Sequence, residues 1–195
     1  MTVEARLTLW QGSLMLIVVG GLPGTGKTTI SRAVAIRRSA TYLRIDAIEQ
    51  AIRDAGVPEV GCAGYRVANV LAEANLMNGQ TVVADCVNPV AESRNAWKAI
   101  AARAEVRLIE VEVVCSDPVQ HRRRVEGRIS DIPGLTLPTW QSVLERDYQP
   151  WEEPHLIIDT AKLTADDAIP AVERQIDAGS CHPGGSSAVP RRSRR

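Results

Sequence analysis

The 195-residue chain contains 45% hydrophobic and 24% charged residues, a composition that excludes a wholly disordered protein. Its 23 basic and 23 acidic side chains balance, which argues against a nucleic-acid coat protein, because neutralising phosphates requires a basic surplus. The longest apolar run, residues 14–19, is far shorter than the roughly 18 residues that span a membrane. We therefore expect one domain, with at most a small appendage, and no association with a membrane.

The two ends of the chain differ in composition from the rest. Four arginines lie among the last five residues and no acid follows Asp177, so residues 1–177 carry 19 basic and 23 acidic side chains. Residues 178–195 are small, polar and rich in proline and glycine, which predicts a disordered basic tail; contact with nucleic acid or lipid is the less favoured role. Met15 lies inside the first apolar run, so residues 1–13 are interpreted as an N-terminal extension that could precede the native start. This leaves residues 14–177 as the folded domain.

Short apolar runs alternate with helical patterns between these ends. Strands are predicted at residues 14–19, 42–45, 81–84, 106–114 and 156–158. Helices are predicted at residues 27–38, 47–55 and 65–77, from Pro89 with Asn88 as N-cap, from Pro118 after Asp117, and from Thr164. Strands that alternate with helices indicate an α/β fold of three layers with a five-stranded parallel sheet. The wholly apolar first strand fits a position that is covered on both faces.

A glycine-rich motif follows the first strand. Residues 21–28, GLPGTGKT, match GxxxxGK[ST] in full, and they lie between an apolar strand and a helix, as a P-loop (Walker A) does. Amides of such a loop and the N-terminus of the next helix bind phosphate. The residues predicted to bind the nucleotide are Gly21, Gly24, Thr25, Gly26, Lys27, Thr28 and Thr29. Lys27 is expected to reach the β and γ phosphates and the Thr28 hydroxyl to bind Mg²⁺. A glycine-rich turn without a ligand is the alternative.

Two aspartates are predicted to end strands and to face the same crevice, since ligands bind beyond the carboxyl ends of parallel strands. Asp85 ends the run TVVAD, which has Walker B form and predicts a Mg²⁺ ligand, direct or through water. Asp46 follows the second strand and is interpreted as a general base that deprotonates an acceptor hydroxyl. An N-cap of the following helix is the alternative role for Asp46.

A basic run follows the fourth strand. In HRRRVEGR, Arg124 and Arg128 are four residues apart, so a continuous helix would place both on one face. Two guanidinium groups there predict a catalytic helical lid that stabilises charge on a transferring phosphoryl group, with residues 131–134 as its hinge. A solvated basic face with Glu126 as a local partner is the alternative.

The aromatic and sulfur-containing residues carry weaker signals. Trp140, Tyr148 and Trp151 cluster in a proline-rich segment, where they either line an acceptor or adenine pocket or pin a loop to the core. The histidines and cysteines show no metal-ligand or disulfide spacing, and no histidine suggests a catalytic role. We expect Cys86 and Cys115 to be buried structural residues in a reducing, cytoplasmic environment.

Five segments together resemble the small P-loop kinases grouped as zeta-toxin-like or AAA-type kinases, which include chloramphenicol phosphotransferase, gluconate kinase, adenylylsulfate kinase and polynucleotide 5′-kinase. The segments are GGLPGTGKTT, YLRIDAIE, VVADCVNP, CSDPVQHRRRVEGR and HLIIDTA, and they span about residues 14–160. The resemblance implies that Asp46 is the acceptor base and that Asp159-Thr160 lies near the adenine. It also places Arg124 and Arg128 in the lid.

The expected acceptor region departs from this family at one position. Where several relatives have Asp-x-x-Arg, with the arginine on an anionic acceptor, this chain has Asp46-Ala-Ile-Glu49. A glutamate would repel an anion, so a neutral or cationic hydroxyl compound is expected, unless Glu49 is only a solvated helix residue. The same resemblance implies that Asn88 touches the acceptor.

Together these observations predict a cytoplasmic kinase that uses Mg²⁺ and ATP and transfers the γ-phosphoryl group to a hydroxyl of a small molecule. ATP is favoured over GTP because the guanine motif NKxD is absent from the sequence. A polynucleotide 5′-hydroxyl kinase and a regulatory or toxin-like module with slow ATPase activity are the alternatives. A monomer or homodimer is expected, with nucleic acid as the less favoured partner.

Overall fold

Five parallel strands form one sheet in the order β2-β3-β1-β4-β5. They are β1 (Met15–Gly20), β2 (Thr41–Arg44), β3 (Val82–Asp85), β4 (Arg107–Val114) and β5 (Leu156–Asp159). The computed structural model describes residues 14–178, so the predicted N-terminal extension and, apart from Ala178, the basic tail lie outside the described residues. The α/β fold with a five-stranded parallel sheet is confirmed.

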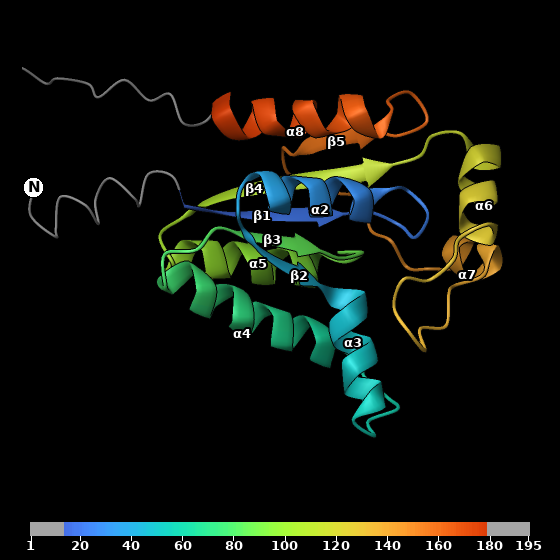
Figure 1. The fold of residues 1–195 in the computed structure, drawn as a ribbon, viewed down its shortest axis with the longest axis horizontal. Helices are drawn as coiled ribbons and strands as arrows, with labels where there is room; N and C mark the ends of the chain where they lie inside the picture. Colours follow the sequence, from blue (N-terminus) through green and yellow to red (C-terminus); the bar gives the residue numbers. More distant parts are fainter. Residues whose placement is uncertain (1–13, 179–195) are drawn as a thin grey trace, which may run out of the picture.

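Helices connect the strands and form two outer layers. They are α2 (Lys27–Arg37), α3 (Ile45–Asp54), α4 (Ala63–Met77), α5 (Ala91–Arg103), α6 (Pro118–Glu126), α7 (Trp140–Leu144) and α8 (Ala165–Ala178). α2 and α8 cover one face of the sheet, and α4 and α5 cover the other (Figure 1). α6 and α7 lie beyond the carboxyl ends of the strands (Figure 1). Within residues 14–178, no helix has the length and apolar character needed to cross a membrane.

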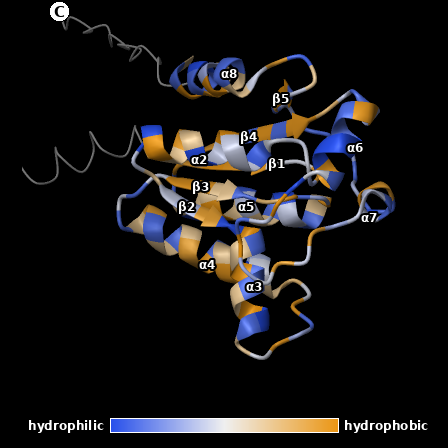
Figure 2. Ribbon diagram, turned by 45° about the vertical axis from the view of Figure 1, so that its right-hand side comes forward, coloured by the Kyte–Doolittle hydropathy of each residue, from blue (hydrophilic) through white to orange (hydrophobic). Residues whose placement is uncertain are grey.

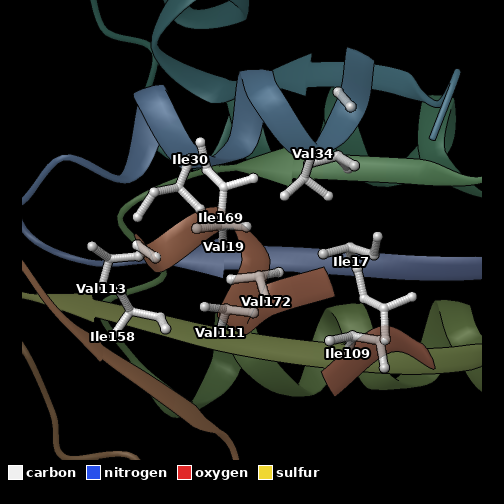
Figure 3. Packing of buried hydrophobic residues seen from close by; sticks show 14 of the residues in the cluster. Ile17, Val19, Ile30, Val34, Ile109, Val111, Val113, Ile158, Ile169 and Val172 are labelled. Carbon is white, nitrogen blue, oxygen red and sulfur yellow. The ribbon is translucent and has the colours of Figure 1, made fainter. Parts of the chain in front are cut away.

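The centre of the sheet is the most deeply buried part of the fold. Every residue of β1 is buried, because β1 pairs with β3 on one side and β4 on the other and is covered on both faces. Val19, Ile30 and Val172 belong to the core beneath α2 and α8 (Figure 3). Burying one such aliphatic side chain contributes roughly 1.5–3 kcal/mol. The strands are accordingly hydrophobic in Figure 2, whereas α6 is largely hydrophilic.

The start of α5 differs from the prediction. α5 begins at Ala91 with Val90 as its N-cap. Asn88 is therefore not the cap, and Pro89 is not the first helical residue. Asn88 has a φ of +53°, a left-handed conformation that asparagine tolerates, and its carbonyl oxygen accepts a hydrogen bond from Arg94 Nη1 at 3.1 Å. The chain thus makes an extra turn before the helix starts.

α6 begins as predicted and ends earlier. Asp117 is the N-cap, and its carboxylate accepts hydrogen bonds from backbone amides of the first turn. The helix ends at Glu126 with Gly127 as its C-cap. Arg128 therefore lies beyond the helix, and the prediction that it shares a helical face with Arg124 was wrong.

Candidate active site

The P-loop connects β1 to α2 at the carboxyl end of the central strand. Gly21 and Gly24 have φ angles of +143° and +84°, in a region that residues with a Cβ atom rarely adopt. A Cβ atom at Gly21 would lie 2.2 Å from the carbonyl oxygen of Val113 in β4. One at Gly24 would lie 2.5 Å from Cγ2 of Val125 in α6. The loop is therefore enclosed between the sheet and α6.

The far end of this loop lines a cavity of about 610 Å³, here called the nucleotide cavity. Five of the predicted nucleotide-binding residues are brought together on its wall: Gly24, Gly26, Lys27, Thr28 and Thr29. Gly21 and Thr25 are not among the lining residues and instead shape the loop. Thr25 Oγ1 donates a hydrogen bond of 2.8 Å to the carbonyl oxygen of Leu22. Lys27 is 4% exposed, so solvent screens its charge weakly.

Asp85 ends β3, as predicted, but does not lie on the wall of the nucleotide cavity. It is 2% exposed, and its Oδ2 accepts a hydrogen bond of 2.7 Å from the Tyr42 hydroxyl. Burial and the neighbouring Asp85 raise the pKa of Tyr42, which keeps Tyr42 a hydrogen-bond donor at neutral pH. Oδ2 also lies 4.0 Å from Nε of Arg44.

The donor groups in this region fit a nucleotide phosphate together with Mg²⁺. The glycine-rich backbone at the start of α2 and the Lys27 ammonium suit phosphate oxygens. For a metal, the Thr28 hydroxyl and the Asp85 carboxylate are available, and residues 14–178 hold no cluster of three or more acidic, histidine or cysteine side chains. Mg²⁺ commonly takes one or two protein ligands and completes its shell with phosphate and water. The chain therefore fits a metal that arrives with the nucleotide.

A second cavity, of about 580 Å³, is here called the acceptor cavity. Asp46, Glu49 and Arg53 line it from α3, and Arg146 lines it from the segment after α7. Asp46 lies in the first turn of α3, whose N-cap is Arg44. Asp46 thus neither ends the second strand nor caps the helix, and both predicted placements were wrong by two residues or fewer. The side chain nevertheless reaches the predicted crevice.

Lys27 and Arg128 line both cavities and so form the boundary between them. Nη2 of Arg128 lies 4.0 Å from Oδ2 of Asp46, and the two side chains are 22% and 28% exposed. A phosphate in the first cavity and a hydroxyl group in the second would meet at the same two cations. The predicted catalytic residues Asp46, Lys27 and Arg128 are therefore brought together.

Glu49 is built into the wall of the acceptor cavity. A Cβ atom at Gly64 would lie 2.3 Å from Glu49 Cγ, so the start of α4 packs directly on this side chain. Burial raises the pKa of Glu49, and the nearby Asp46 raises it further. Arg53 Nη2 lies 3.7 Å from Glu49 Oε2 and offsets part of its charge. Glu49 is thus more than a solvated helix residue, but its predicted repulsion of anions is weakened by Arg53.

The structure does not place the Asn88 side chain in the acceptor cavity. Its neighbours Val87 and Pro89 line that cavity, whereas Asn88 is 0% exposed. Its backbone N–H donates a hydrogen bond of 2.8 Å to the Tyr65 hydroxyl, and its side-chain amide has no hydrogen-bond partner among the described residues. Asn88 is therefore not among the residues that line this cavity, and its contact with an acceptor stays a prediction.

Arg124 joins α6, the predicted lid, to the end of β5. Its Nη1 and Nη2 donate hydrogen bonds of 2.7 and 3.0 Å to Oγ1 and the carbonyl oxygen of Thr160. Arg124 and Thr160 also line a cavity of about 300 Å³ that shares Gly26 and Thr29 with the nucleotide cavity. Hydrogen bonds from Ser116 hold the pKa of the neighbouring Asp159 well below its usual range. This corner is where the sequence resemblance placed the adenine.

The aromatic cluster holds loops on the core. Trp151 Nε1 donates a hydrogen bond of 3.0 Å to the Tyr148 hydroxyl, which donates one of 2.8 Å to Glu112 of β4. Neither aromatic residue lines the nucleotide or acceptor cavity. A Cβ atom at Gly20 would lie 2.5 Å from the Trp151 ring, so this ring packs against the end of β1. Of the two predicted roles for these side chains, the structure supports pinning of the loop.

A family model described as AAA domain, AAA_33, matches residues 16–146. The chain belongs to this family. No curated protein sequence matches it. Among solved structures, a candidate kinase from Chloroflexus aurantiacus has a TM-score of 0.67 and 22% identity over 86% of this chain and 98% of that chain. A gluconokinase from Sinorhizobium meliloti has a TM-score of 0.59 and 20% identity over 85% of this chain and 95% of that chain. The APS kinase CysC of Mycobacterium tuberculosis, in complex with AMPPNP and APS, has a TM-score of 0.62 and 19% identity over 85% of this chain and 96% of that chain. The fold is that of the small P-loop kinases, as the sequence predicted.

Sequence reasoning missed several residues of the site in this AAA domain protein. His121 of α6 was not expected to act, yet its Nε2 lies 2.7 Å from the carbonyl oxygen of Pro23 in the P-loop. Its ring also meets Trp140 edge-to-face, with centroids 5.1 Å apart. Arg32 and Arg44 line the nucleotide cavity and were not predicted. For Arg44, the available signal was a charged residue in a short strand that is otherwise expected to be buried.

Proposed function

We propose that this protein is a kinase that transfers the γ-phosphoryl group of Mg·ATP to a hydroxyl group of a small molecule. The observation that carries the proposal is the pair of cavities with Lys27 and Arg128 on the wall of both. A protein that only hydrolyses or senses a nucleotide needs the first cavity alone. The fold of small P-loop kinases supports the same conclusion.

On the donor side, the P-loop amides and Lys27 would bind the phosphates of ATP. Arg124, held on Thr160, would border the base and ribose end, and Arg128 would border the transferring group. Developing negative charge on the equatorial oxygens would be stabilised by Lys27 and Arg128, which solvent screens weakly. Thr28 and Asp85 would hold a bound Mg²⁺, which would supply charge neutralisation on the phosphates.

On the acceptor side, Asp46 would orient the substrate hydroxyl and receive its proton. The hydroxyl oxygen bonds to the γ phosphorus while the bond from that phosphorus to the β-bridging oxygen breaks, so ADP leaves with the electron pair. Asp46 suits this role because it lines the acceptor cavity and lies 4.0 Å from Arg128. General bases of this kind contribute on the order of 10²–10⁴ in rate.

The acceptor is proposed to be a small molecule. A cavity of about 580 Å³ is within the range that binds metabolite-sized ligands, and carboxylates and guanidiniums of α3 both line it. Solved structures of similar fold include a gluconokinase and an APS kinase, whose names give different substrates, so the lining of this cavity is the better guide. Asp46 and Glu49 share this wall with four basic side chains (Lys27, Arg53, Arg128 and Arg146), so a hydroxyl compound that is neutral or carries a negative charge fits it.

The test is an ADP-release screen across antibiotics, sugars, nucleosides and oligonucleotides, with Lys27→Ala as the blank. In the presence of the active acceptor, Asp46→Asn should lower kcat by about 10²–10⁴ and leave ATP affinity unchanged. Glu49→Gln is the matched control, since it removes a carboxylate of the same helix that is expected to alter KM for the acceptor rather than kcat.

Turnover by Asp46→Asn at the wild-type rate would refute the assignment of the base. ATP binding without ADP release for any acceptor would favour a regulatory module instead. ADP release that occurs only with oligonucleotides, and that falls steeply as the salt concentration rises, would favour the polynucleotide kinase.

A further inference from the structure

The nucleotide cavity is strongly basic. Among the described residues that line it, six are basic (Lys27, Arg32, Arg44, Arg123, Arg124 and Arg128), and a single acid, Asp131, is present. Lys27, Arg124 and Arg128 have roles in the proposed transfer. Arg32 and Arg44 do not, and both of them bind Asp131.

Asp131 lies on the connection between α6 and α7 and reaches across the cavity to the opposite wall. Its Oδ2 accepts a hydrogen bond of 2.8 Å from Arg32 Nη2 of α2. Arg44 Nη1, at the end of β2, donates bonds of 2.9 Å to both carboxylate oxygens. These bonds lower the pKa of Asp131 to about 2, so the carboxylate is ionised at neutral pH. A lid carboxylate thus occupies two cations of a cavity that is built for anions.

Arg44 has more donor capacity than Asp131 uses. The side chain is 7% exposed, and its Nε and Nη2 are shielded from solvent without a hydrogen-bond partner among the described residues. A buried donor that lacks a partner costs free energy, and natural proteins rarely leave one. Asp85 does not satisfy it, because its Oδ2 lies 4.0 Å from Nε. A planar guanidinium matches the oxygens of a phosphate, and Nη1, which bonds to Asp131, is the part of Arg44 that such a ligand would take over.

The exposure and the backbone around Asp131 allow its side chain to move away from Arg32 and Arg44. Its side chain is 48% exposed, and the segment that carries it is bounded by Gly127, which ends α6, and Gly134, which has a φ of +75°. An ionised carboxylate and a phosphate repel each other at short range, so they compete for the same two arginines.

We propose that Arg32 and Arg44 form a phosphate-binding subsite which Asp131 occupies as an internal substitute anion, and that a phosphate group of the bound nucleotide displaces it. Displacement would release the lid segment from α2 and β2, so nucleotide entry and lid movement are coupled through one carboxylate. The proposal rests on the assignment of this cavity to a nucleotide. It does not depend on which acceptor is phosphorylated, or on whether one is.

The test is calorimetric titration of the full chain with ATP, AMP and inorganic tripolyphosphate at one ionic strength. Asp131→Asn keeps the size of the side chain and removes the competing charge. It should bind ATP and tripolyphosphate about three- to tenfold more tightly than the wild type and bind AMP equally. Arg44→Gln should weaken the binding of ATP and tripolyphosphate, and adding Asp131→Asn to Arg44→Gln should give a smaller gain in affinity than in the wild type, because only Arg32 is then released.

Glu126→Gln is the matched control. It removes one negative charge from α6, where Glu126 pairs with Arg122, and leaves Arg32 and Arg44 untouched. Equal tightening in Glu126→Gln and Asp131→Asn would reduce the effect to net charge and overturn the proposal. Unchanged or weaker binding of tripolyphosphate by Asp131→Asn would also overturn it. Weaker binding is expected if Asp131 keeps its bonds to Arg32 and Arg44 while the ligand is bound and so helps to hold the ligand. If ATP and tripolyphosphate bind as expected but no acceptor releases ADP, the subsite stands and the kinase proposal fails.

Discussion

The floor and the roof of the site are built in opposite ways. The floor, made of β1, the P-loop and α2, is formed by a fully buried strand and a loop whose glycines leave no room for a Cβ atom. The roof, residues 115–139, is held by separate polar contacts from His121, Arg124 and Asp131. Dense packing resists displacement, whereas single polar contacts can be exchanged for contacts with a ligand. The floor is therefore suited to hold phosphate and the roof to respond to it.

The largest effect is expected from a Cβ atom in the floor. Gly21→Ala would bring Cβ to 2.2 Å from a backbone oxygen of β4 at a φ of +143°. We expect a loss of roughly 2–4 kcal/mol in the free energy of unfolding, measured in urea. Gly56→Ala is the control, since it has a φ of +90° but nothing within 4 Å, and should cost about 1 kcal/mol. Equal losses in the two variants would show that the floor is less rigid than its packing indicates.

An intermediate effect is expected where roof and floor meet. His121→Phe keeps a ring against Trp140 and removes the partner of the Pro23 carbonyl oxygen, which should cost about 1–2 kcal/mol of stability. Because the P-loop loses this polar contact with α6, ATP affinity should fall by about three- to tenfold. His155→Phe also loses a histidine contact, to Glu112, but outside the site. It should keep the ATP affinity of the wild type, and a similar fall in both variants would contradict the link.

The smallest effect is expected at the exposed ion pairs of Asp131 and depends on pH. The pKa of Asp131 is about 2 in the fold, against about 3.9 unfolded. The stability that it contributes is thus fully present above pH 4 and is lost as the pH falls from about 4 to about 2. With a side chain that is 48% exposed, the contribution should not exceed about 1 kcal/mol. The measurement is the difference in unfolding free energy between wild type and Asp131→Asn; a difference that stays constant from pH 7 to pH 2 would refute the ion pairs.

The same contrast explains what the sequence could predict. The P-loop, the alternation of strands and helices and the Asp117 cap depend on residues that are close together in the chain, and each was predicted. Asp46 was placed within two residues, because the strand and helix patterns overlap at Ile45. Helix ends were less certain, since Gly127 ends α6 inside a pattern that otherwise continues.

The contacts of the roof could not be predicted because their partners lie far apart. Arg44 and Asp131 are 87 residues apart, and His121 and Pro23 are 98 apart. A residue type at position 44 or 121 does not indicate which distant group it meets. The turn at Asn88 was missed for a different reason: asparagine favours both helix caps and left-handed turns, and the sequence alone does not decide between them.

The positions of the two described ends of the chain have a practical consequence. β1 starts and α8 ends at the edge of the sheet opposite to α6 and α7 (Figure 1), and Arg107 at the start of β4 bonds to the carbonyl oxygen of Gln175 near the end of α8. A surface linker or fluorophore joined at either end would therefore sit away from both cavities. Immobilised protein should therefore bind ligands without the linker covering either cavity.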